Sequence, residues 1–117
     1  MIRIKRIYDP PSKDDGARFL VDRLWPRGVR KDAAGGIRWL REVAPSDELR
    51  RWFAHDPLKW DEFRRRYAEE LDAKPEAWVP LLRAAEQSTL TLLFAAKNEQ
   101  TNNAVALEEY LKTRRAL

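Results

Sequence analysis

The sequence predicts an α/β protein: a single domain of three layers in which helices flank a small, mainly parallel sheet. Two apolar, strand-like runs, over residues 17–23 and 90–95, are separated by a long stretch with helical periodicity. Parallel strands need a crossover of this kind, which is usually helical. The chain has 117 residues, the usual length of one domain, so we expect residues 1–117 to share one core.

The first three strands are expected in the N-terminal third of the chain. Ile2 and Ile4 alternate with basic residues, which is the period of a half-buried strand. Prolines and acidic residues then break the pattern, and the second strand follows at residues 17–23. Apolar and polar residues alternate again over residues 37–43. We interpret this segment as a short third strand, with a helix as the competing interpretation.

The middle of the chain carries several helix start signals. Ser46 is followed by two acidic residues and is a good N-cap. Asp56 before a proline is a second N-cap with Pro in the first helical position. Pro75 can open a third helix, but Pro80 would then lie inside it. We therefore expect that helix either to begin near Val79 or to be kinked there.

The C-terminal part reads as strand, turn and helix. The run over residues 90–95 is continuously apolar, which is typical of a strand covered on both faces. A last helix is expected from Glu99 or Thr101 to Arg115. If the sheet is parallel, this strand and the one at residues 17–23 end at the same edge, where ligands bind in open α/β sheets. The helix that starts there adds unpaired amides and a positive dipole.

Composition excludes several classes of protein. The chain has no cysteine and one histidine, so disulfides, thiolate nucleophiles and cysteine zinc sites are excluded, and we expect no metal site. No apolar run approaches the roughly 18 residues of a membrane span, and no signal peptide is recognisable. We expect a soluble, cytoplasmic protein. Motifs for dinucleotide binding, phosphate loops, zinc proteases and serine hydrolases are absent from the sequence.

The positive charge is concentrated near the N-terminus. Of the 23 Lys and Arg residues, nine lie in residues 1–31, together with only four of the 19 acidic residues. This excess is compatible with an anionic ligand or with a nucleic acid, and also with an ordinary basic surface.

The segment after the second strand carries the first group of candidate site residues. Asp22 and Arg23 end an apolar strand, where charged groups must be solvated, paired or used. We expect an arginine, near Arg23 or at Arg27, to pair with Asp22. Arg27 can also bind a carboxylate or phosphate in a forked geometry, and Trp25 offers a stacking face. Trp25 can equally seal the core.

The second group lies elsewhere in the chain. Lys97 and Asn98 follow the strand at residues 90–95, with Thr101 and two further asparagines as additional polar groups, although Asn98 can be no more than a helix cap. His55 is the only imidazole that could transfer a proton near neutral pH. A loop or capping role is its alternative.

We therefore expect a pocket for a small anionic ligand, carrying phosphate or carboxylate, at the carboxyl edge of the sheet. Arg23, Arg27 and Lys97 would hold the anion, with Trp25 and Asn98 beside them. Asp22 would orient an arginine or act as a base, and His55 would be the acid or base of any reaction. The alternatives are nucleic-acid binding with Trp25 as a stacking platform, and an interaction module without a ligand. Whether a reaction follows binding, which cofactor is used and the oligomeric state are left open.

Several motifs together resemble a known family. The chain carries YDPP at 8–11, DG at 15–16, VDRLWPRG at 21–28, VAPS at 43–46, WFAHDP at 52–57 and LFAAK at 93–97, with Trp60, Phe63 and Tyr67. This combination resembles the YeaO-like branch of the bacterial family known as domain of unknown function 488. The resemblance implies a compact α/β protein of the cytoplasm, without an established activity. It carries over the charged and aromatic positions Asp22, Arg23, Trp25, Arg27, His55, Asp56 and Lys97.

Overall fold

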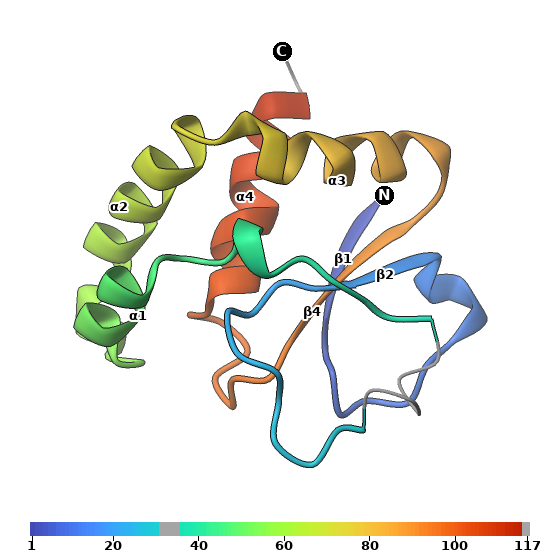
Figure 1. Cartoon of the computed structure of the whole chain (residues 1–117), viewed down its shortest axis with the longest axis horizontal. Helices are drawn as coiled ribbons and strands as arrows, with labels where there is room; N and C mark the ends of the chain where they lie inside the picture. The colour runs from blue at the N-terminus through green and yellow to red at the C-terminus, as the bar shows by residue number, and fades with distance from the viewer. Residues whose placement is uncertain (31–35, 116–117) are drawn as a thin grey trace.

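The computed structural model describes residues 1–30 and 36–115 and contains a four-stranded parallel sheet (Figure 1). The strand order is β1–β4–β2–β3, and each neighbouring pair is parallel. The strands are β1 (Ile2–Arg6), β2 (Ala17–Leu20), β3 (Arg38–Trp39) and β4 (Leu90–Phe94). The predicted α/β class is confirmed, as is the parallel pairing of the second strand with the strand at residues 90–95.

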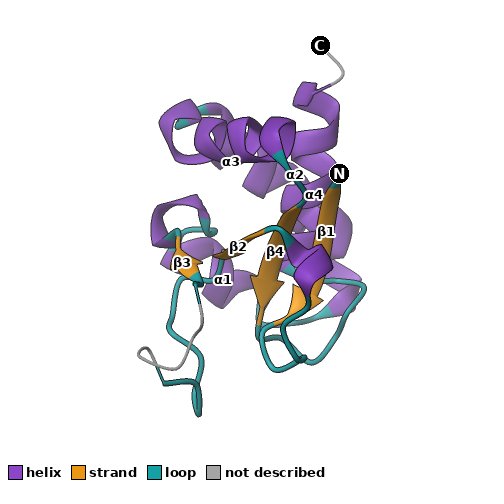
Figure 2. Ribbon diagram, turned by 90° about the vertical axis from the view of Figure 1, so that its right-hand side faces the viewer, coloured by secondary structure: helices purple, strands orange, loops and turns teal. Residues whose placement is uncertain are grey.

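Strand β4 is the centre of the sheet. All five of its residues are buried, and it pairs with β1 on one side and β2 on the other. Leu92 lies opposite Ile4 of β1 and Phe19 of β2. The continuous apolar sequence of β4 follows from this position, since a strand covered on both faces needs apolar residues on both. In Figure 2 the carboxyl ends of β1 and β4 point toward the connecting loops.

Four α-helices and three short 3-10 helices complete the fold. The 3-10 helices are η1 (Lys13–Asp15), η2 (Arg41–Val43) and η3 (Pro57–Lys59), and the α-helices are α1 (Asp47–Phe53), α2 (Trp60–Asp72), α3 (Pro75–Gln87) and α4 (Asn103–Arg115). In Figure 1, α1 and α2 lie together on the left and α3 runs across the top. None of the helices in the described ranges is long and apolar enough to cross a membrane.

The two predicted N-caps are confirmed. The Ser46 hydroxyl accepts a hydrogen bond from the Leu49 amide at 3.1 Å, at the start of α1. Glu70 of α2 then fixes this cap, because its carboxylate accepts from the Ser46 amide at 2.9 Å and from the Ser46 hydroxyl at 2.6 Å. The Asp56 carboxylate accepts from the Leu58 amide at 3.0 Å and begins η3, which leads into α2.

The two faces of the sheet are covered by different layers. Phe19, Leu90 and Leu92 belong to the larger core cluster, which includes residues from all four α-helices. On the other face Ile7, Leu20 and Leu93 form a smaller cluster, against which loop residues such as Trp25 and Trp39 pack. The layers flanking the sheet are thus helical on one face and built from connecting segments on the other.

A buried ion cluster precedes β2. The side chain of Asp15 is 1% exposed, and its carboxylate lies 3.2 Å from Lys5 Nζ, 3.4 Å from Arg18 Nε and 4.0 Å from Arg3. It also accepts from the Ser12 amide at 3.0 Å. Burial raises the pKa of Asp15, but the hydrogen bonds from Ser12 and Lys5 and the nearby cations lower it by more. The net pKa is therefore below its ordinary value.

Several expected element boundaries differ in the structure. The second strand, expected over residues 17–23, ends at Leu20, although the Val21 amide still donates to the Leu93 carbonyl. The third strand covers only Arg38–Trp39, because the chain turns into η2 within the predicted segment 37–43. Helix α3 begins at Pro75 and includes Pro80, so of the two alternatives for this helix only the start near Val79 is wrong. Pro80 is exposed, so water can satisfy the carbonyl that loses its donor. The last helix begins at Asn103 rather than at Glu99 or Thr101.

The close approach of Gly16 to Thr89 gives the first prediction. Gly16 has φ of 63°, and a Cβ there would lie 2.1 Å from the Thr89 carbonyl oxygen. Gly16→Ala should lower the free energy of unfolding by about 3 kcal/mol or more, since backbone strain and a backbone clash add. Gly28 is the matched control, because it has φ of 83° and open space around its Cβ position.

Gly28→Ala should cost only the conformational part, about 1 kcal/mol. Urea unfolding of both variants measures the difference. Equal destabilisation by the two substitutions would contradict the contact between Gly16 and Thr89.

Candidate functional site

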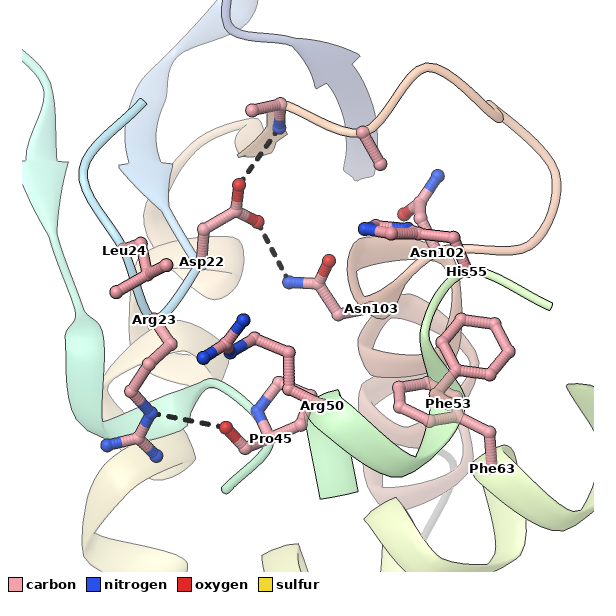
Figure 3. A pocket seen from close by; sticks show the side chains of 12 residues that line it. Asp22, Arg23, Leu24, Pro45, Arg50, Phe53, His55, Phe63, Asn102 and Asn103 are labelled. Carbon is pink, nitrogen blue, oxygen red and sulfur yellow. Dashed lines mark hydrogen bonds between the residues drawn. The ribbon is translucent and has the colours of Figure 1, made fainter. Parts of the chain in front are cut away.

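A cavity of about 300 Å³ opens at the carboxyl edge of the sheet, where β2 and β4 end (Figure 3). Its sheet side is formed by Asp22, Arg23, Leu24, Ala95 and Ala96. Pro45, Arg50, Phe53, His55 and Phe63 come from α1, α2 and the segments beside α1, and Asn102 and Asn103 come from the start of α4. The volume suits a small ligand. The predicted meeting of the two strand ends thus coincides with a cavity.

Asp22 joins three segments at this edge. One carboxylate oxygen accepts from the Ala95 amide, just after β4, and the other from the Asn103 side-chain amide, both at 3.0 Å. Asn103 also donates to the Val21 carbonyl at 3.0 Å. In the described part of the chain no arginine pairs with Asp22. The expected Asp22–arginine pair is therefore wrong: two neutral donors take the place of the guanidinium.

The pKa of Asp22 reflects these surroundings. Burial raises the pKa above its ordinary value, and this effect outweighs the lowering by the hydrogen bonds from Asn103 and Ala95 and by the charge of His55. Two neutral hydrogen bonds compensate the lost hydration of a carboxylate less completely than nearby cations do. Asp22 is thus a half-buried acid whose ionisation is disfavoured by its surroundings.

Arg23 lines the cavity, but two of its nitrogens donate hydrogen bonds to the backbone. Its Nε donates to the Pro45 carbonyl and one terminal nitrogen to the Ala44 carbonyl, each at 3.2 Å. These bonds tie the loop after β2 to the segment before α1. The other guanidinium hydrogens are not used in them.

Arg50 is a cation of the cavity that the sequence did not single out. One terminal nitrogen pairs with Asp47 at 3.2 Å on the surface of α1. Its Nε is buried and has no hydrogen-bond partner. Figure 3 shows the guanidinium extending from α1 toward the space that Asp22 and Asn103 face. The spacing of Asp47 and Arg50 is that of an ordinary helix surface pair, so no sequence signal marked Arg50.

His55 reaches the cavity through a strained turn. Ala54 and His55 have φ of 48° and 58°, in the left-handed region that costs a residue with a side chain about 1–2 kcal/mol. Ala54 ends α1 in this conformation, which is a common way to end a helix, although glycine usually occupies the position. His55 continues the turn, and its exposed ring lies at the cavity. Strain of this kind gathers at functional sites.

The asparagines after β4 mainly shape the chain. Asn98 accepts from the amides of Gln100 and Thr101 at 2.9 and 3.0 Å, and its carbonyl accepts from the Asn102 side chain at 2.9 Å. Asn102 in turn caps α4, since its side chain accepts from the Val105 amide at 3.0 Å. Asn98 holds this turn and does not line the cavity.

Three other predicted site residues also lie outside the cavity lining. Trp25 donates from its indole to the Val29 carbonyl at 2.6 Å and packs edge-on against Trp39, 5.4 Å away. Arg27 and Lys97 are exposed. The structure therefore brings Asp22, Arg23 and His55 together in the cavity, while Trp25, Arg27, Lys97 and Asn98 lie around that edge of the sheet.

Comparison with known proteins places the chain in a family. The family model described as the inactive DUF488-N3 subclade matches residues 1–116. The chain belongs to this family. It is 40% identical over 112 residues to the uncharacterized protein YeaO of Escherichia coli K12, with 96% of this chain and 97% of that protein covered. It is also 40% identical over 113 residues to the uncharacterized protein Rv3073c of Mycobacterium tuberculosis H37Rv, covering 97% and 95%.

The expected resemblance to this DUF488 family is confirmed by these matches. No solved structure matches the chain significantly. Within the ranges that the structure describes, no three carboxylate or imidazole side chains come together to hold a metal ion. The chemistry available at the cavity is hydrogen bonding and ion pairing by Asp22, Arg23, Arg50, His55 and Asn103.

The raised pKa of Asp22 gives a prediction on pH dependence. The folded state holds the Asp22 proton more tightly than the unfolded state, so the wild type loses stability as pH rises from the unfolded value of 3.8 through the folded pKa. Asp22→Asn cannot ionise. Its free energy of unfolding, relative to that of the wild type, should increase over this pH window and stay constant above it.

Asp15→Asn is the contrasting variant. The pKa of Asp15 is lowered, so its ionisation stabilises the wild type, and this contribution is lost as pH falls below 3.8. Relative to the wild type, Asp15→Asn should become less stable as pH rises through that lower window. Urea unfolding between pH 2.5 and 7 measures both differences. The same slope for the two variants would contradict the assignment.

Proposed function

We propose that this protein binds a small ligand bearing a carboxylate or phosphate in the cavity at the carboxyl edge of the sheet, and that it binds this ligand without converting it. Arg50 is the principal anion contact. Arg23 and His55 assist from neighbouring walls, and the first turn of α4 adds its positive dipole.

The buried Nε of Arg50 carries this proposal. A buried donor without an acceptor costs about 1–3 kcal/mol, and the Arg50 Nε has no partner in the structure. It belongs to a side chain that lines the cavity, and one terminal nitrogen is already held by Asp47. A carboxylate or phosphate in the cavity would supply the missing acceptor and a second bond in the forked geometry that arginine favours.

Two observations favour binding over catalysis. The matching family is described as an inactive subclade. Asp22, the expected base, already accepts one hydrogen bond on each carboxylate oxygen, from Ala95 and Asn103. A carboxylate held by these bonds is better suited to recognising a ligand than to removing a proton from the ligand.

The packing of Trp25 favours a small ligand over a nucleic acid. A stacking platform needs an open aromatic face, whereas Trp25 packs against the smaller core cluster and Trp39. Arg27 and Lys97, which are exposed near the same edge, would contact only those parts of a ligand that extend beyond the cavity.

Arg50→Met tests the proposal directly. Isothermal titration with phosphate, phenyl phosphate and 3-phenylpropionate should show binding of at least one of these anions to the wild type. Arg50→Met should weaken that binding at least tenfold, because the charged forked contact is lost. The variant should fold normally, since its pair with Asp47 is exposed and such pairs contribute about 0–1 kcal/mol.

Arg51→Met is the matched control. Arg51 is the next residue on α1, is exposed and lies outside the cavity lining. Its removal changes the net charge by the same amount and should leave the affinity within about twofold, because exposed charges at this distance are screened. Equal weakening by both variants, or no anion binding by the wild type, would contradict the proposal.

A further inference from the structure

Two carboxylates with contrasting partners flank β2: Asp15 is buried and Asp22 is half-buried. Asp15 lies before the strand among three cations, the nearest 3.2 Å away. Asp22 lies after the strand and accepts two neutral hydrogen bonds, from Ala95 and Asn103, with no ion pair in the described part of the chain. Buried charges are normally paired. The cavity beside Asp22 is the open space from which a cation could reach it.

Two charged side chains at the cavity thus have unused hydrogen-bonding capacity, the Asp22 carboxylate and the Arg50 guanidinium. Asp22 has lone pairs left on both oxygens after its two hydrogen bonds. Arg50 has a buried Nε without an acceptor. The two side chains do not form a salt bridge with each other, although both line the same cavity and come from different elements. A ligand carrying both charges would satisfy the two at once.

We propose that the ligand of this cavity is a zwitterion with an apolar group, of the α-amino-acid class: its ammonium group pairs with Asp22 and its carboxylate with Arg50. This inference rests on the proposed function, which assigns the anion to Arg50, and adds the second charge. No bond is formed or broken.

The remaining walls select the apolar group. Phe53 and Phe63 are stacked with ring centroids 4.2 Å apart and lie along one side of the cavity. Leu24, Pro45 and the alanines after β4 cover much of the rest. Such walls favour an aliphatic or aromatic side chain and disfavour a second charged group. The volume of about 300 Å³ accommodates an amino acid of ordinary size.

Matched compounds that differ by one charged group test the inference. The first set is L-phenylalanine, 3-phenylpropionate, which lacks the amine, and 2-phenylethylamine, which lacks the carboxylate. The second set is L-leucine, 4-methylpentanoate and 3-methylbutylamine. Isothermal titration of the wild type at pH 7 should show that at least one amino acid binds ten or more times as tightly as its acid and its amine.

Asp22→Asn separates the two charges. The variant should lose the preference for the amino acid over the acid, because a neutral amide cannot pair with the ammonium group and no longer repels the carboxylate of the acid. Asp14→Asn is the control, since Asp14 is exposed on η1, outside the cavity lining. It should keep the full preference.

The outcomes distinguish the inference from the proposed function. If the acids bind the wild type as tightly as the amino acids in both sets, the zwitterion is overturned and anion binding stands. If no amino acid, acid or phosphate compound binds, both are overturned. The wild-type comparison needs no variant, so the inference stays testable even where Asp22→Asn fails to fold. A preference that survives in folded Asp22→Asn also overturns the role of Asp22.

Discussion

The hydrogen bonds of Asp22 hold the carboxyl edge of the sheet together. Its carboxylate joins the end of β2 to the amide after β4 and to the first residue of α4, while Asn103 also grips the Val21 carbonyl. The parallel register continues up to this point, since the Val21 amide donates to the Leu93 carbonyl at 3.1 Å. This side chain therefore helps to place the start of α4, which forms one wall of the cavity. Asp22 is half-buried and joins three segments through neutral donors, and it forms no salt bridge with any arginine or lysine in the described part of the chain.

The two ends of β2 carry the same type of side chain in contrasting surroundings. At Asp15 the cations of β1 and β2 neutralise the carboxylate, and the Thr91 hydroxyl donates to its backbone carbonyl at 2.6 Å, so the group is fully used in the fold. The arginine next to Asp22 in sequence is engaged elsewhere: Arg23 donates to the carbonyls of Ala44 and Pro45. Arg23 therefore bonds backbone carbonyls and not Asp22, which lines the cavity. This division of roles motivates the assignment of ligand recognition to Asp22 and Arg50.

Local patterns predicted much of the fold and part of the site. The parallel strands followed from apolar runs, and the caps at Ser46 and Asp56 from residues whose preferences act over three or four positions. The predicted start of α4 was too early. Asn98 accepts from the Thr101 amide in a separate turn, and Asn102 is the residue that caps the helix. Arg50 was missed because it lines a cavity formed by distant segments and has a buried Nε without a partner, neither of which any local spacing records. Tertiary contacts alone decide which of many charged residues remains unpartnered.

A carbon-detected NMR titration of the side-chain carboxyl groups measures the difference between the two carboxylates. We expect the pKa of Asp22 to lie above 3.8 and that of Asp15 below it in the same folded protein. Both values come from one sample, so the solution conditions are identical. A pKa for Asp22 at or below that of Asp15 would show that a cation neutralises Asp22 in the free protein, and would contradict the account of the cavity.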